Sequence, residues 1–356
     1  MLYINSLDSG EVLSSYNFAR KSDFVFSEII SRKQFEELDK SNLKIIYADQ
    51  NKIFYKATKF EIQNNQIVFC NTYFVKNFFK LINQIPNLKN IQLITHQTDL
   101  PINKKLFNLK PEAVSKWYSI NVDYHHPDLI PIPIGLSNEY SPKNVFKKDY
   151  ESLNFINLDE KEDKIYVNFQ KNTRFISRSI LEKNIKNLDL VKFDKPDLTI
   201  NQYLNKINSY RYVLCPRGNG IDTHRIWETL YAGSIPILEE EMTYQTCDGL
   251  PVIFVKNFNE LNDTFLNLID LNLNLLNFSN EKLTVSYWLN QINLNVNKNK
   301  AKNSKKNLVI EDEIDFIKSI NQYKRRIAAE GKIKKITTLN RRIFQKFLDL
   351  YFGKIQ

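Results

Sequence analysis

The chain has 356 residues, of which 42% are hydrophobic and 13% aromatic, and it carries a formal net charge of +10 with a pI near 9.2. This length exceeds twice a typical domain of about 150 residues, and the apolar content is enough for real hydrophobic cores, which excludes a disordered chain and indicates two domains. The three cysteines are odd in number and lack a CxxC spacing, so they exclude a disulfide framework and a cysteine zinc site: Cys70, Cys215 and Cys247.

The N-terminal segment has no apolar stretch of signal-peptide length, and no window approaches the ~20 apolar residues that a membrane-spanning helix needs. We therefore expect a soluble, cytoplasmic protein. The positive charge favours anionic partners, among them nucleotides, acidic glycans, lipid diphosphates, anionic membrane surfaces and nucleic acid. Charge alone does not choose among these partners.

Short β-like runs alternate with helical ones in residues 1–150. The runs at 43–48, 67–70 and 91–95 predict strands, and the amphipathic spacing of 73–85 predicts a helix. We expect a first Rossmann-like domain here. The charged stretch 141–164 predicts a linker, and a strand at 165–169 then opens a second Rossmann-like domain. We place that second domain at 151–292 and a helical tail at 293–356.

Two polar segments of the first half carry possible chemistry. His96 and Asp99 come directly after the predicted strand at 91–95. Residues 116–135 contain further histidines and aspartates ahead of a short proline-containing strand: Asp123, His125, His126 and Asp128. Because successive strand residues point to opposite faces, adjacent histidines seldom share a metal ion. We predict no metal site and a loop that lines a cleft.

Residues 212–239, YVLCPRGNGIDTHRIWETLYAGSIPILE, combine a strand, a glycine turn, a helix and a second strand. Three of the chain's 8 glycines lie here, which predicts tight turns with positive φ at Gly218 and Gly220 and close approach of a ligand to the backbone. Asp222 or Thr223 can cap the helix, and Gly233 takes its C-cap position. The helix has an apolar stripe formed by Ile226, Trp227, Leu230 and Tyr231.

A strand, helix and strand of this length predict a right-handed crossover in a parallel sheet, whose carboxyl edge binds ligands. The helix start presents unpaired N–H groups, and Arg217 and Arg225 add guanidinium groups that suit phosphate oxygens. Glu228, three residues after Arg225, can accept hydrogen bonds from ribose hydroxyls. The alternative is a solvated helix start with Glu228 in a surface ion pair. We predict a diphosphate site with a backbone cradle of Gly218, Asn219 and Gly220.

The segment CPRGNGIDTHRIWETLYAGSIPI resembles the C-terminal signature of exostosin-like glycosyltransferases, in which CPRG is followed by an Arg, a Glu-Ala-Leu or similar, and Gly-x-Ile-Pro. That family has the GT-B architecture of two Rossmann-like domains facing a cleft, and it transfers a sugar from a nucleotide-diphosphate donor to a glycan. The resemblance implies that Arg217 and Arg225 hold the diphosphate and that Glu228 holds the ribose. We therefore predict an α/β fold of GT-B type with a helical C-terminal tail.

Retaining GT-B enzymes often place two glutamates eight residues apart at this site, whereas Gly220 and Pro236 stand eight residues before and after Glu228. This departure favours an inverting mechanism. In inverting GT-B enzymes a side chain of the first domain deprotonates the acceptor, so His96 and Asp99 are the candidate bases. Alternatively, Asp99 caps a helix near 102–109 and His96 packs at the strand end.

The first turn of the second domain commonly gives a second diphosphate contact in GT-B folds. Lys171 or Arg174 would supply it here, with Arg178 a weaker candidate, and a solvated basic turn is the alternative. In such a site arginines and the N-terminal end of a helix neutralise the charge of the leaving diphosphate, in place of a metal ion. No Asp-x-Asp motif follows a strand, so we expect no metal and no cofactor other than the nucleotide sugar as co-substrate.

The tail reads as a basic linker followed by helices near 310–329 and 332–352. The second helix is amphipathic and basic, so it either lies on an anionic membrane surface at the inner face of a membrane or docks on the first domain.

The interpretation as a whole is a glycosyltransferase whose acceptor is a glycan or a lipid-linked glycan. A DNA-modifying glucosyltransferase and a non-catalytic nucleotide-sugar or glycan-binding protein are the alternatives. Scattered lysines do not favour nucleic acid.

Overall fold

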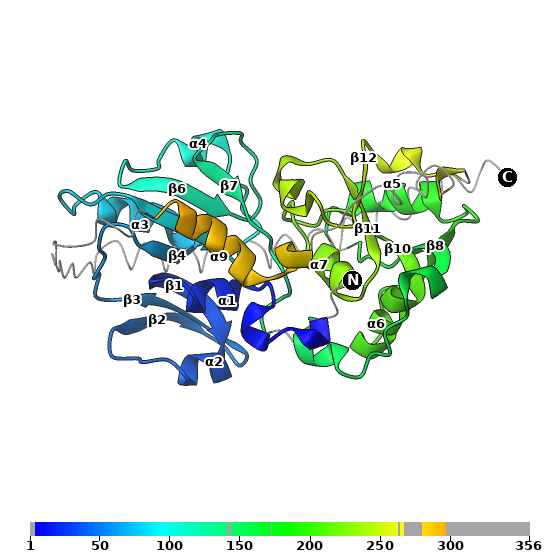
Figure 1. Cartoon of the computed structure of the whole chain (residues 1–356), viewed down its shortest axis with the longest axis horizontal. Coiled ribbons are helices and arrows are strands. Elements are labelled where there is room, and N and C mark those ends of the chain that lie inside the picture. Colours follow the sequence, from blue (N-terminus) through cyan, green and yellow to red (C-terminus); the bar gives the residue numbers. More distant parts are fainter. Residues whose placement is uncertain (1–3, 141–143, 172, 263, 267–279, 297–356) are drawn as a thin grey trace.

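A computed structural model describes residues 4–140, 144–171, 173–262, 264–266 and 280–296. Two α/β bodies lie side by side (Figure 1). Each has one sheet with helices against it, and together they form the GT-B architecture that the sequence predicts. The predicted helical tail and its membrane or docking role lie outside the described residues, and the predicted domain boundaries stay predictions.

The first body contains a seven-stranded sheet in the order β2-β3-β1-β4-β5-β6-β7. From β1 to β7 neighbouring strands are parallel, while β3 pairs antiparallel with both β1 and β2. The strands are β1 (Phe24–Ser31), β2 (Leu43–Ala48), β3 (Lys52–Ala57), β4 (Ile67–Asn71), β5 (Ile91–His96), β6 (Val114–Ser119) and β7 (Leu129–Pro131). The predicted strands at 43–48, 67–70 and 91–95 are confirmed.

Every residue of β4 and β5 is buried, as in strands of a parallel sheet covered on both faces. The helix predicted at 73–85 is present as α3 (Val75–Ile82), which buries its apolar face against the sheet. The other helices of this body are short: α1 (Ser15–Arg20), α2 (Arg32–Glu36) and α4 (Lys104–Phe107).

The second body has a five-stranded parallel sheet in the order β12-β11-β10-β8-β9. Its strands are β8 (Glu162–Val167), β9 (Val191–Phe193), β10 (Tyr210–Leu214), β11 (Ile235–Glu239) and β12 (Ile253–Val255). Its helices are α5 (Phe175–Ile185), α6 (Ile200–Ser209) and α7 (His224–Tyr231). The predicted strand, helix and strand over 212–239 are therefore confirmed as β10, α7 and β11.

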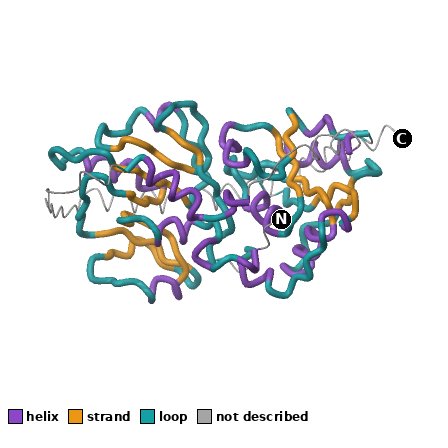
Figure 2. The backbone as a smooth tube through the Cα atoms, viewed as in Figure 1, coloured by secondary structure: helices purple, strands orange, loops and turns teal. Residues whose placement is uncertain are grey.

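After the second sheet the chain returns to the first body. Helix α9 (Val285–Leu294) lies across the first body beside α1 (Figures 1 and 2). Ser286 donates its backbone N–H and its hydroxyl to the Glu11 carboxylate, and Asn295 donates to the Tyr118 hydroxyl at 2.9 Å. The segment that follows the second sheet is thus packed on the first body through α9.

The largest hydrophobic cluster contains residues of both bodies. It joins Phe18, Ile132 and Ile134 of the first body to Trp227 and Tyr231 of α7. The Tyr231 hydroxyl accepts from the Leu13 N–H at 2.9 Å and donates to the Leu283 carbonyl at 2.7 Å. Helix α7 is therefore held against the first body by a shared core.

Candidate functional site

The turn between β10 and α7 is clamped from α5. Arg178 donates its Nη2 to the carbonyls of Pro216 at 3.0 Å and Arg217 at 3.1 Å, and its Nη1 to the Gln170 carbonyl at 2.6 Å. The sequence ranks Arg178 below Lys171 and Arg174, but the structure makes it the side chain that shapes the turn.

Arg225, the second residue of α7, keeps one guanidinium nitrogen without a protein partner among the described residues. Its guanidinium lies 5.2 Å from the centre of the Tyr203 ring, and its Nη1 is buried without a hydrogen-bond partner among the described residues. Burial, followed by the charges of Arg225 and Arg174, lowers the pKa of Arg178 to about 10. Arg178 is thus repelled by Arg225 and by Arg174, and a bound anion would relieve that repulsion.

The other predicted phosphate ligands are already paired or exposed. Arg217 Nη1 lies 2.7 Å from a Glu241 carboxylate oxygen, and Lys171 Nζ lies 2.6 Å from one of Glu182. Arg174 is exposed and stands before α5 in the left-handed conformation, with φ 47°. These ion pairs would have to open before Arg217 or Lys171 binds phosphate.

Glu228 is buried rather than in the exposed ion pair that the alternative interpretation expects. Its Oε2 accepts from the Tyr203 hydroxyl at 2.7 Å, and its backbone carbonyl accepts from Tyr150 at 3.0 Å. Tyr203 of α6 therefore supports both Arg225 and Glu228. Nothing in the sequence pattern distinguishes Tyr203 from other apolar-face residues of an amphipathic helix.

The glycines of the turn have a different role from the one expected. Gly218 and Gly220 do not adopt positive φ, so that prediction is wrong. Gly233 does, with φ 69°, but it lies one residue after the C-cap of α7, which is Ala232. A Cβ on Gly220 would stand 3.0 Å from Asn121 Oδ1 and 3.2 Å from Asp99 Oδ1. Gly220 is thus needed because the first body approaches the turn closely.

Asn121 makes this approach. It follows β6 in the left-handed conformation, with φ 55°, and its Oδ1 accepts from the N–H groups of Ile221 at 2.7 Å and Asp222 at 2.9 Å. The amides that directly follow the predicted Gly218–Gly220 cradle are thus bound by the first body. Thr223 takes the N-cap position without a side-chain hydrogen bond, and its hydroxyl is buried without a partner among the described residues.

Asp222 forms a second joint between the bodies. Its carboxylate accepts from the Ile134 N–H at 2.8 Å and from the Trp227 indole at 3.1 Å. Burial raises the pKa of Asp222 to about 7. The adjacent Gly135 has φ 65°, and any Cβ there would meet the Leu13 carbonyl oxygen at 2.1 Å.

A cavity of about 250 Å³ lies where the two bodies meet at this joint. Both predicted bases line it, and His224, the first residue of α7, lines it from the second body. The remaining wall is mostly hydroxyl and amide groups: Ser15, Tyr73, Gln97, Thr98, Ile134, Leu136, Ser137, Asn138 and Tyr140. We refer to it as the junction cavity.

His96 and Asp99 differ in what they can do there. His96 Nδ1 accepts from the Gln97 N–H at 2.8 Å, and its Nε2 faces the Pro133 carbonyl at 3.4 Å. Burial lowers the pKa of His96 to about 3, so the ring is neutral with both nitrogens turned to backbone. Asp99 is exposed to the cavity and does not cap α4, since Asn103 does. The environment of His96 matches the alternative interpretation, a histidine packed at the strand end.

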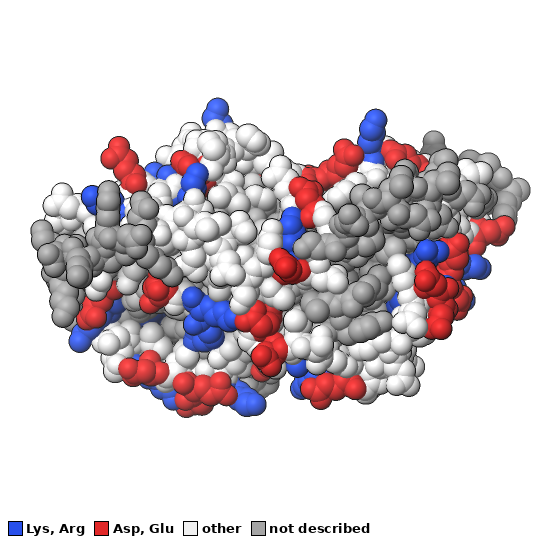
Figure 3. Space-filling model, in the orientation of Figure 1, with Lys and Arg blue, Asp and Glu red and all other residues white. Residues whose placement is uncertain are grey.

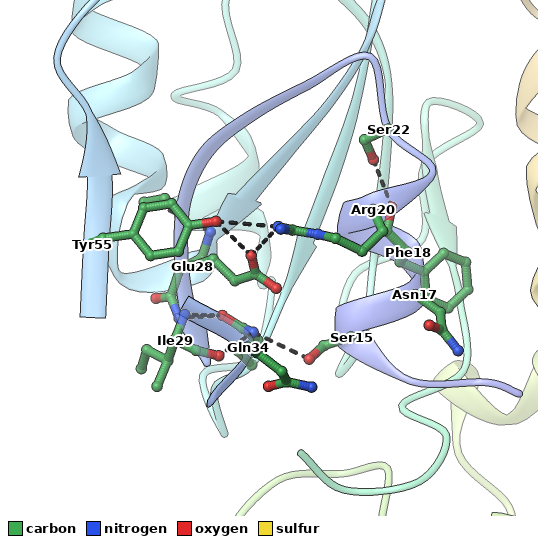
Figure 4. Close-up of polar contacts among 12 residues, drawn as sticks. Ser15, Asn17, Phe18, Arg20, Ser22, Glu28, Ile29, Gln34 and Tyr55 are labelled. Atoms are coloured by element: carbon green, nitrogen blue, oxygen red, sulfur yellow. Dashed lines mark hydrogen bonds and ion pairs between the residues drawn. The ribbon is translucent and has the colours of Figure 1, made fainter. Parts of the chain in front are cut away.

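Polar contacts of β1 residues lie next to Ser15 and Gln97, which line the junction cavity, and Figure 4 shows those of Glu28. Glu28 is fully buried, and its Oε2 bonds to the Arg20 guanidinium and to the Tyr55 hydroxyl, the latter at 2.7 Å. Gln97 pairs with the backbone of Ile29 in both directions, at 2.8 Å each. Residues at the exits of β1 and β5 are thereby locked together behind the cavity.

The segment with adjacent histidines is not part of this site. His126 packs against Phe107, with ring centroids 4.5 Å apart, and Asp128 pairs with Lys116 at 2.9 Å. Among the described residues no group of three His, Cys, Asp or Glu side chains could hold a metal ion. Likewise, no helix in the described ranges is long and apolar enough to cross a membrane.

Residues 178–308 match the RXYLT1 C-terminal domain, a ribitol xylosyltransferase-like glycosyltransferase family. The matched range begins at Arg178 and includes the whole 212–239 unit, with Arg225 and Glu228. It does not include Asp99, Lys171 or Arg174. No curated protein matches the chain.

Proposed function

We propose that the protein is a glycosyltransferase that uses a nucleotide-diphosphate sugar. The observation that carries the proposal is Arg225, whose buried Nη1 has no partner in the described structure, beside Arg178 at the start of α7. A diphosphate would neutralise this cluster, and the N-terminal end of α7 would add its partial positive charge. The match of this segment to a glycosyltransferase family supports the same function.

The junction cavity would hold the transferred sugar and the reacting hydroxyl of the acceptor. In the proposed inverting step the acceptor oxygen bonds to the anomeric carbon as the bond from that carbon to the diphosphate oxygen breaks. Asp99 takes the acceptor's proton, and the electron pair of the broken bond leaves with the diphosphate. Arg225 and Arg178 stabilise the charge that develops there, so no metal is required. Glu228 would contact the ribose.

The acceptor we propose is a glycan or a lipid-linked glycan. From the sequence we also propose kinship with the exostosin-like glycosyltransferases and a location in the cytoplasm or at the inner face of a membrane. Basic and acidic side chains intermingle on the face shown in Figure 3, which does not favour a nucleic-acid surface there. A notch between the two bodies is visible at the upper edge of the same view.

A thermal-shift panel tests the proposal. The full chain is heated with nucleoside diphosphates and with nucleotide sugars, including nucleotide-linked xylose because of the family's name. A donor at 100 times its dissociation constant should stabilise the fold by ~2.7 kcal/mol. The same ligand should not stabilise an Arg225→Ala variant, and stabilisation should persist in excess EDTA. A panel in which no nucleotide stabilises the wild-type protein would overturn the proposed function.

A further inference from the structure

His224 is a polar group of the junction cavity that the proposed transfer step does not use. It is the first residue of α7 and lines the cavity from the second body, while Asp99 lines it from the first. The proposed diphosphate lies at the start of the same helix. His224 lines the cavity and immediately precedes Arg225 in the chain, so a sugar attached to that diphosphate would extend toward the cavity at His224.

The hydrogen bond of His224 fixes what its ring offers to that cavity. Nδ1 lies 2.7 Å from the Gly135 carbonyl oxygen. A carbonyl oxygen can only accept, so Nδ1 carries a proton and donates it. In the neutral ring Nε2 then bears a lone pair. His96, in contrast, accepts at Nδ1 and must carry its proton on Nε2.

The support for this ring is rigid. Gly135 follows Ile134, whose N–H is bonded to the buried Asp222, and Gly135 itself is pressed against Leu13. The carbonyl that orients His224 thus belongs to the joint between the bodies. A His224 ring held in this way presents Nε2 as a hydrogen-bond acceptor of fixed direction. Such an acceptor suits recognition of one hydroxyl group.

We propose that His224 is a specificity-determining residue: its Nε2 accepts a hydrogen bond from one hydroxyl of the transferred sugar. The inference rests on the proposed function and adds to it that the second body recognises a hydroxyl group of the transferred sugar. The titratable groups that line the same cavity are Asp99, His96, Tyr73 and Tyr140. Asp99 keeps the role of base, and His224 acts by positioning the sugar.

The tautomer is tested without any ligand. The full chain is labelled with ¹⁵N-histidine, and the ring nitrogens are recorded at alkaline pH, where imidazole is neutral. The His224 signals are assigned by their loss in His224→Asn, with His125→Asn, at an exposed histidine, as the matched control. We expect a protonated Nδ1 and a bare Nε2 for His224, and the opposite for His96. A protonated Nε2 with a bare Nδ1 on His224 would overturn the inference.

The contact is tested with the donor that the thermal-shift panel identifies and with its singly deoxygenated sugar analogues. The amide nitrogen of His224→Asn takes about the place of Nδ1, so this variant keeps a donor for Gly135 and loses Nε2. For one analogue the wild-type kcat/KM should fall about tenfold, the scale of one hydrogen bond, and this penalty should vanish in His224→Asn. The penalties at the other positions should be unchanged.

The two proposals fail differently. If no nucleotide sugar binds, the proposed function fails. If a donor binds in an Arg225-dependent way but every deoxygenation penalty persists in His224→Asn, the inference about His224 fails and the proposed function stands.

Discussion

His96 and Asp99, three residues apart at the end of β5, differ in exposure: His96 is buried and Asp99 is exposed. His96 is enclosed, and its ring stacks on Phe69 with centroids 6.5 Å apart. A base must reach the proton that it removes, and an imidazole with both nitrogens on backbone cannot. Asp99 opens onto the junction cavity, so it is the base candidate that the geometry supports.

Asp99→Asn should lower kcat by about 10² to 10⁴-fold while leaving donor affinity unchanged, because a neutral amide cannot take the proton. Steady-state kinetics and donor titration measure the two quantities. Asp123→Asn, at an exposed position of the same body that does not line the cavity, is the control. A fold-competent His96→Gln should keep turnover within about tenfold and lose stability instead. If Asp99→Asn retains wild-type turnover, the base lies elsewhere.

At the scale of elements, the β10–α7 turn is shaped by its neighbours more than by its own sequence. Arg178 of α5 holds its carbonyls, and Asn121 after β6 holds its amides. The two turn glycines suggested backbone freedom, but at Gly220 the requirement is space. A Cβ on Gly218 would meet only Arg178 Nη2, at 3.8 Å.

Gly220→Ala should therefore lower the free energy of unfolding by about 1–3 kcal/mol, the usual cost of overpacking, and weaken donor binding. Denaturant unfolding gives the first quantity. Gly218→Ala in the same turn and Gly10→Ala, where a Cβ would meet nothing within 4 Å, are matched controls expected to stay within about 0.5 kcal/mol of wild type. Equal effects of the three substitutions would contradict the role given to Gly220.

How far the sequence predicts the molecule depends on the range of the interaction. Local periodicity predicted β4, β5, α7 and β11, because burial on a strand or helix face repeats along the chain. Local periodicity could not show that Arg178 and Asn121 hold the turn, or that Tyr203 contacts Arg225 and Glu228 of α7. Those contacts join segments from about 20 to 100 residues apart, and a single sequence does not record which segments meet.

At the scale of the whole molecule, the two bodies share a hydrophobic cluster and a polar joint at Asp222. The pKa of Asp222 is raised from 3.8 to about 7 by burial, so the folded protein binds this proton more tightly than the unfolded chain does. The stability contributed by that proton is fully present below about pH 4 and is lost as the pH rises to about 7.

The free energy of unfolding of the wild type, minus that of Asp222→Asn, should consequently fall as the pH rises from about 4 to 7. The fall should be at most about 1.4 kcal/mol per pH unit. Urea unfolding of both proteins over this range measures it. Glu28, whose pKa burial also raises to about 7, titrates alike in both proteins and cancels in the difference. A difference that does not depend on pH would show that Asp222 is not buried as described.

The central claim is that α7 and its arginines activate a nucleotide-diphosphate donor, and turnover of that donor tests it most directly. With the donor found by thermal shift, nucleoside diphosphate release is measured for wild type and for Arg225→Ala. We predict that kcat/KM falls by at least ~100-fold in the variant, the scale of losing one preorganised charge contact, while the protein stays folded. A folded Arg225→Ala protein that releases the diphosphate at near wild-type rates would contradict the account.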